Sequence, residues 1–102
     1  MLTKEEILRK TEENKEKIKK YGVKKIGIFG SFVRGEQKEG SDLDFVVEFE
    51  EEGKSYNNFI NLIFFLEGLF DKKVDLLTRE GVKNIRIKEV RESIERSVEY
   101  VS

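Results

Sequence analysis

The sequence predicts a small α/β (α+β) fold, in which helices pack mainly on one face of a mixed β-sheet. Short apolar runs bounded by turn residues have the length and composition of strands, at residues 24–30, 44–50 and 73–77. Longer segments with helical spacing of apolar residues flank and separate them, at 3–21, 55–70 and 90–100. Strands and helices that alternate in this way are typical of an α/β sandwich.

The N-terminal elements have recognisable boundaries. Thr3-Lys4-Glu5-Glu6 is a capping box, which predicts the start of a charged helix that ends at Gly22. The strand at 24–30 runs into a glycine turn. Residues Ser31–Arg34 then have room for one helical turn before Gly35.

The central strand and the helix after it are predicted from different periodicities. Apolar and polar residues alternate between 44 and 50, so Phe45, Val47 and Phe49 share a buried face and Asp44 lies on the wetter face. In contrast, apolar residues surround most of the helix at 55–70. One small sheet cannot cover such a helix, so part of it is predicted to bind a partner, in a homo- or hetero-oligomer.

Composition narrows the possible functions. The chain has 102 residues, which fits a single domain spanning 1–102. It carries 20 Lys and Arg against 21 Asp and Glu, so it lacks the basic excess of a nucleic-acid-binding protein. The absence of Cys and His excludes disulfides, thiolate chemistry and imidazole bases. No apolar run is long enough to span a membrane and no signal peptide is recognisable, so a cytoplasmic protein is expected.

Residues 30–44 concentrate the groups that could carry chemistry. Gly30-Ser31 ends the first strand, where a glycine lets a backbone amide approach a phosphate and the hydroxyl can donate to it. Arg34-Gly35 places a guanidinium near the same turn. Asp42 and Asp44 project to the same side of an extended segment, where they repel each other unless a cation lies between them. Paired carboxylates of this kind suit Mg²⁺ bound together with substrate phosphates.

Asp75 could complete this group from another strand. If the strand at 73–77 neighbours the one at 44–50, the Asp75 carboxylate reaches the same site. The chain has 17 Glu but only four Asp, and three of those four are the residues singled out here. Two metal ions held by such a group can clamp the attacking and leaving oxygens of an in-line displacement.

Each of these features also has a simpler explanation when taken alone. An Asp-x-Asp sequence after a glycine is commonly a turn with a capping acid, and Ser31 is suited to cap a helix N-terminus. The acidic run formed by Glu48 and residues 50–52 is expected to be a solvated strand end. The order in which the features occur together favours the metal site.

The composite pattern resembles the nucleotidyltransferase superfamily. The segment GSFVRGEQKEGSDLDFVVEFE, followed by KVDLLT, matches its order of Gly-Ser, Arg-Gly, Asp-x-Asp and a later Asp on the next strand. The resemblance covers roughly residues 20–80. Since no second domain is recognisable, the chain looks like a minimal nucleotidyltransferase (MNT), a group commonly paired with small helical HEPN toxins in toxin–antitoxin systems.

The resemblance implies a role for each matched residue. Gly30-Ser31 would bind the triphosphate of the nucleotide, and Asp42 and Asp44 would ligate divalent metal, two Mg²⁺ ions or Mn²⁺ in their place. Asp75 would hold the second metal and help to deprotonate the acceptor hydroxyl. For Arg34 either a phosphate contact or an ion pair that braces the turn remains open. The base is not specified by any recognised motif.

The expected function is therefore metal-dependent transfer of AMP from ATP to a hydroxyl. By resemblance, the acceptor is a Tyr of a HEPN-type toxin and the protein is its antitoxin. The alternative is a non-catalytic antitoxin that neutralises the same partner by forming a complex. Transfer to a small molecule is disfavoured, because the chain has no second domain to build an acceptor pocket.

Overall fold

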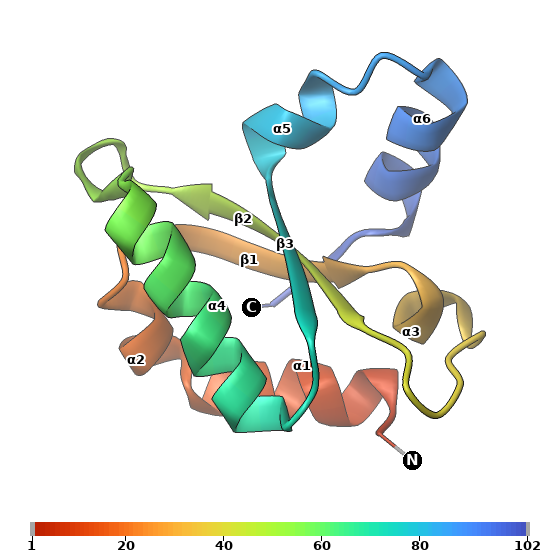
Figure 1. The fold of residues 1–102 in the computed structure, drawn as a ribbon, viewed down its shortest axis with the longest axis horizontal. Helices are drawn as coiled ribbons and strands as arrows, with labels where there is room; N and C mark the ends of the chain where they lie inside the picture. The colour runs from red at the N-terminus through yellow and green to blue at the C-terminus, as the bar shows by residue number, and fades with distance from the viewer. Residues whose placement is uncertain (1, 102) are drawn as a thin grey trace.

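Strands and helices interleave along the chain (Figure 1). The computed structural model describes residues 2–101. Its elements are, in order, α1 (Lys4–Glu13), α2 (Lys15–Lys19), β1 (Val23–Phe29), α3 (Ser31–Arg34), β2 (Leu43–Phe49), the 3₁₀ turn η1 (Glu51–Gly53), α4 (Tyr56–Phe70), β3 (Val74–Thr78), α5 (Arg79–Lys83), α6 (Lys88–Ser97) and β4 (Glu99–Tyr100).

The four strands form one mixed sheet in the order β3-β2-β1-β4. β1 is antiparallel to both β2 and β4, whereas β2 and β3 are parallel. A parallel pair needs a crossover connection, and here α4 provides it. The predicted mixed-sheet α/β fold is confirmed.

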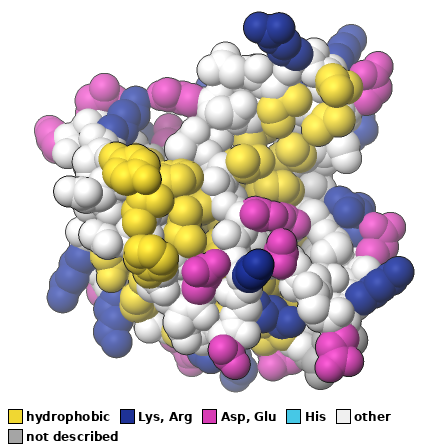
Figure 2. Space-filling view, viewed as in Figure 1, with side chains coloured by type: hydrophobic (Ala, Val, Ile, Leu, Met, Phe, Trp, Pro, Cys, Tyr) yellow, Lys and Arg dark blue, Asp and Glu magenta, His cyan; other side chains and the backbone are white. Residues whose placement is uncertain are grey.

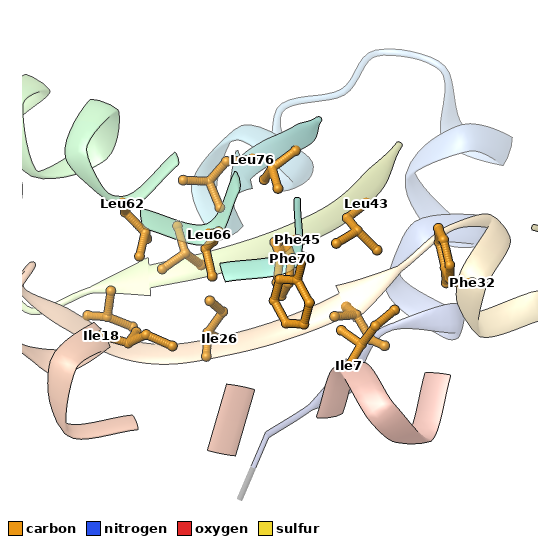
Figure 3. Close-up of a cluster of buried hydrophobic side chains, with 14 of the residues drawn as sticks. Ile7, Ile18, Ile26, Phe32, Leu43, Phe45, Leu62, Leu66, Phe70 and Leu76 are labelled. Atoms are coloured by element: carbon orange, nitrogen blue, oxygen red, sulfur yellow. The ribbon is translucent and has the colours of Figure 1, made fainter. Parts of the chain in front are cut away.

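The main core lies between the sheet and α1, α2 and α4, which gather on one face (Figures 1 and 3). Ile7 and Ile18 from α1 and α2, and Leu62 and Leu66 from α4, are at most 2% exposed. They pack in one cluster with Phe45 of β2 and other inward-facing strand residues. Burial of the three alternate residues from Phe45 to Phe49 confirms the face predicted from their spacing.

A smaller cluster occupies the opposite face. Phe29 of β1, Val46 of β2 and Val82 of α5 form its buried centre, and Ile94 of α6 packs against it. α6 has no fully buried residue. The helices therefore cover the first face more extensively than the second, as predicted.

The N-terminal segment differs from its prediction in one respect. The Thr3 hydroxyl accepts a hydrogen bond from the Glu6 amide at 3.2 Å, as the capping box predicts. The helix is interrupted at Asn14, however, where the side-chain amide donates to the Lys10 carbonyl at 2.8 Å. The expected single helix is thus two helices, α1 and α2, before Gly22.

The exposed side of α4 is apolar, as its composition predicts. Tyr56 is 78% exposed and Phe64 65% exposed. Figure 2 shows hydrophobic side chains gathered over this helix. Within residues 2–101, no helix has the length and hydrophobicity needed to cross a membrane.

Candidate active site

The parallel strands bring two of the predicted aspartates side by side. Asp44 of β2 and Asp75 of β3 are direct register partners. On the other side of β2, Asp44 pairs with Phe29, the last residue of β1. Because side chains alternate along a strand, Asp44 lies on the face of Val46, away from the main core. The site is therefore at one end of the sheet, on its less covered face.

The surroundings of the Asp44 carboxyl disfavour its ionised form. Its pKa is raised from the ordinary 3.8 to about 6, chiefly because the group is partly buried. The negative charges of Asp75 and Asp42 raise this pKa further, as does a hydrogen bond with Asp75, while the Arg34 guanidinium lowers it. Asp44 thus interacts with three of the other residues that the sequence singled out.

Asp42 is less closely integrated than the other two aspartates. It is exposed, and it lies before β2 in a turn where the Ser41 hydroxyl accepts a hydrogen bond from the Lys38 amide at 2.8 Å. Among the described residues 2–101, no three acidic side chains are arranged to hold a metal ion. The fold pairs Asp44 with Asp75, and the charge of Asp42 acts on Asp44.

Gly30 is required by the shape of the site. Its φ of +80° and ψ of −152° fall in a region that is open essentially to glycine alone. A Cβ at this position would collide with Oδ2 of Asp44 and lie 3.0 Å from its Cγ. The absent side chain therefore makes room for the carboxylate. Ser31 follows as the first residue of α3, next to this contact.

For Arg34 the sequence left two alternatives, a phosphate contact or an ion pair that braces the turn, and the structure contains an ion pair. Its Nε donates to Oε1 of Glu36 at 2.8 Å, across the turn that begins at Gly35. The charge of the guanidinium also reaches Asp44 and lowers its pKa. Arg34 therefore braces the turn and contributes positive potential to the site.

Lys73 is a cationic residue whose backbone borders this site and which the motifs of the sequence did not indicate. Its carbonyl accepts a hydrogen bond from the Leu43 amide at 2.9 Å, immediately before the paired residues of β3. The alternation that places Asp75 on the outer face of β3 also applies to the residue two positions earlier. The two-residue spacing between Lys73 and Asp75 is the sequence signal that could have identified Lys73.

A cavity of about 500 Å³ lies elsewhere, at the carboxyl ends of β2 and β3. Glu48 and Arg79 line it and form an ion pair at 3.1 Å. Lys54 lines it as well, and pairs with Glu51 at 3.4 Å and with Glu80 at 2.9 Å. The acidic run is thus partly neutralised by neighbouring cations, and the cavity includes none of the three aspartates.

The chemistry of the aspartate end fits a divalent cation. The donors are hard carboxylate oxygens, which Mg²⁺ and Mn²⁺ prefer. Burial, and then the charges of Asp75 and Asp42, raise the pKa of Asp44 and so disfavour its ionised form. A bound cation would reverse that penalty, because it attracts each carboxylate while separating their charges.

Comparison with known proteins identifies a matching family and several similar proteins. The model of the nucleotidyltransferase domain family matches residues 7–101. Protein adenylyltransferase MntA of Thermococcus cleftensis is 47% identical over 85 residues, covering 82% of this chain and 85% of that protein. A Methanocaldococcus jannaschii protein, also assigned as a protein adenylyltransferase, is 45% identical over 98 residues, covering 94% and 92%.

Solved structures share the fold. One, described as a minimal nucleotidyltransferase, superimposes with a TM-score of 0.66 at 30% identity, covering 90% of this chain and 93% of the other. A toxin–antitoxin structure with AMP-PNP gives a TM-score of 0.63 at 20% identity, covering 87% and 70%. At that identity the second likeness concerns the fold alone.

Proposed function

Because the chain belongs to the nucleotidyltransferase domain family, we propose that it transfers AMP from ATP to a Tyr hydroxyl of a HEPN-type helical toxin and is the antitoxin of that pair. Relatives that match most of the chain are named protein adenylyltransferases, which supports AMP as the group transferred and a protein as the acceptor. The toxin partner and its Tyr are proposed from the resemblance to MNT proteins. The proposal places the reaction in the cytoplasm, where ATP is available.

One observation carries the catalytic part of the proposal. Asp44 and Asp75 face each other from adjacent parallel strands, and the pKa of Asp44 is raised to about 6. A purely binding protein gains nothing from this repulsion, which costs stability. A metal-dependent transferase needs such a pair, since carboxylates must be held ready for a cation.

Asp42, Asp44 and Asp75 would hold the metal, as two Mg²⁺ ions or as Mn²⁺. When bound, divalent metal supplies charge neutralisation at the phosphates and a lower pKa for the acceptor hydroxyl. Gly30-Ser31 and Arg34 would bind the triphosphate beside the aspartates. Gly30 suits this role because no side chain separates its backbone from the Asp44 carboxylate.

In the proposed step, the acceptor oxygen attacks the α-phosphorus of ATP and forms the new P–O bond. The bond from that phosphorus to the bridging oxygen of the β-phosphate breaks, and pyrophosphate leaves. Asp75 takes the proton from the acceptor hydroxyl, since it lies on a different strand from Asp42 and Asp44. This assigns nucleotide binding mainly to β1 and β2, and proton transfer to β3.

The apolar face of α4 is the proposed contact for the helical toxin. Tyr56 and Phe64 are the most exposed large apolar residues of this helix. Phe64→Glu should therefore weaken the complex while leaving the fold intact, which sedimentation of the two proteins together would measure. An unchanged complex would place the interface elsewhere.

The decisive experiment is intact-mass analysis of the candidate toxin after incubation with ATP, Mg²⁺ and this protein. Wild type should add AMP units, and the Asp42→Asn/Asp44→Asn double variant should add none. Glu52→Gln is the matched control, because it removes an exposed carboxylate remote from the site. If wild type neutralises the toxin without adding mass, the non-catalytic antitoxin is the correct function.

A further inference from the structure

Lys73 lies beside the aspartates at the start of β3. Leu43 is the register partner of Val74, and Asp44 that of Asp75. The Leu43 amide also donates to the Lys73 carbonyl at 2.9 Å, so the parallel ladder includes this residue. Extending the register by one residue places Lys73 next to Asp42.

The alternation of β3 determines which face Lys73 is on. Val74 is 8% exposed and belongs to the main core beneath the sheet. Its neighbours Lys73 and Asp75 therefore point to the opposite face, which is the face of Asp44. Lys73 itself is exposed. Its backbone therefore lies at the open edge of the carboxylate group, within reach of a flexible side chain.

The side chain of the adjacent residue, Lys72, has a different contact. The Lys72 ammonium lies 6.0 Å from the ring centroid of Phe32, a buried residue of the main core. Lys73 forms no ion pair within 4.0 Å inside residues 2–101, although Asp42 and Asp75 are its neighbours in the ladder. In the described part of the chain, the Lys73 ammonium is therefore free of ion pairs within that distance, although its backbone lies beside two carboxylate residues.

We propose that Lys73 binds the triphosphate of the incoming nucleotide, an inference that rests on the proposed function. A triphosphate that approaches three carboxylates is repelled unless cations offset their charge. Arg34 supplies one such charge from α3, and Lys73 supplies a second from the far side of β2. A flexible ammonium is well suited to phosphate oxygens, because it needs no fixed planar geometry.

The test compares Lys73→Gln with Lys72→Gln as the matched control and Lys73→Arg as the conservative variant. Binding of ATP and of adenosine is measured calorimetrically at low salt in EDTA, so that the readout is independent of metal and of turnover. We expect Lys73→Gln to weaken ATP binding about 3–10-fold. Adenosine binding should be unchanged, Lys73→Arg should retain most of the ATP affinity, and added salt should reduce the difference.

Several results would overturn the assignment. Equal ATP affinity for the Lys73→Gln and Lys72→Gln proteins would do so, as would no ATP binding by wild type. An equal loss of affinity for adenosine would indicate a structural role for Lys73. If Lys73→Gln weakens ATP binding but wild type never modifies the toxin, the triphosphate contact stands and the proposed function fails.

Discussion

The two ends of the β2–β3 strand pair differ in their charge partners: acidic residues form ion pairs at one end and face each other at the other. At the carboxyl end, Glu48 pairs with Arg79 at 3.1 Å and Glu80 pairs with Lys54 at 2.9 Å. The hydrogen bond and the charge of Lys54 lower the pKa of Glu80. At the amino end, Asp44 faces Asp75, and their repulsion adds to burial in raising the pKa of Asp44 to about 6.

This contrast shows why acidic residues alone do not identify a site. Both ends of the strand pair are rich in carboxylates, and the far end also has a cavity of about 500 Å³. Only at the amino end are like charges held together by the backbone register. Strongly perturbed pKa values that arise from burial and a specific charge neighbour cluster at functional sites. The comparison therefore separates a solvated charged surface from a candidate catalytic centre.

The largest expected effect comes from removing the proposed proton acceptor at the amino end. Asp75→Asn should reduce AMP transfer by at least ~10²-fold, the loss typical of removing acid–base assistance. Nucleotide binding should change little, because Asp42 and Asp44 remain. Mass analysis of the toxin over time gives the rate, and a fluorescent ATP analogue gives the affinity. Transfer at the wild-type rate would mean that Asp75 is misassigned.

The next effect concerns the glycine that makes room for Asp44. Gly30→Ala adds a Cβ that collides with the carboxylate and forces an alanine into a backbone region it rarely adopts. It should lower the free energy of unfolding by roughly 1–3 kcal/mol and impair transfer.

Gly40→Ala is the control for this substitution. Its φ is +88°, but nothing lies within 4 Å of the added carbon. Only the conformational cost of about 1 kcal/mol should appear in urea denaturation, with transfer retained. Equal losses of activity in both variants would mean that the Gly30–Asp44 contact is unimportant.

A pH experiment sharpens the contrast in the absence of metal. Since the pKa of Asp44 is higher in the folded protein than its ordinary 3.8, the folded state binds this proton more tightly. Metal-free wild type should therefore gain stability as the pH falls through about 6 toward 3.8. Above that range Asp44→Asn should be more stable than wild type, by on the order of 1–3 kcal/mol.

Thermal unfolding across this pH range measures both proteins. The difference between them should disappear at the acidic end, where Asp44 is protonated in wild type. Mg²⁺ with ATP should raise the Tm of wild type more than ATP alone, and the added increment should be lost in the variant. If the wild type were more stable than Asp44→Asn at neutral pH without metal, the proposed repulsion between Asp44 and the neighbouring carboxylates would be refuted.

The smallest effect is expected at the carboxyl end. The Glu48–Arg79 pair joins side chains that are 32% and 45% exposed. A double-mutant cycle with Glu48→Gln and Arg79→Gln should give a coupling energy below about 1 kcal/mol, and transfer should stay near the wild-type rate. A large loss of transfer would mean that this end takes part in the reaction.

Much of the fold could be predicted because its main elements have clear periodicity. Alternation identified the faces of β2, and the long apolar segment identified α4. The elements that were missed are short. α5 has five residues and begins at Arg79, directly after β3, while β4 has only two residues. Such segments are too short for a periodic signal, and tertiary packing against the second cluster determines them.

At the site, features that depend on local spacing could be predicted from the sequence more readily than features that depend on the pairing of distant strands. The shared direction of Asp42 and Asp44 is predicted from the pleat of an extended segment, but β2 begins at Leu43 and Asp42 lies in the turn before it, so this part of the site stays a prediction. The approach of Asp75 depends on β3 being the neighbour of β2, which the sequence leaves as a condition and which the structure meets with a parallel pair. The Gly30–Asp44 contact and the ion pairs of Arg79 and Lys54 depend on distances that no sequence pattern provides.

The parallel crossover also has a consequence for how the chain folds. β1 and β2 are consecutive strands that pair antiparallel, whereas Asp75 meets Asp44 only after α4 has closed the connection between them, residues 45–74. Closure of the longer loop is expected to come later. The charge repulsion then arises at that late step, so metal-free protein should unfold fastest by releasing β3. A cation that bridges the two strands would slow this release and keep the protein folded for longer.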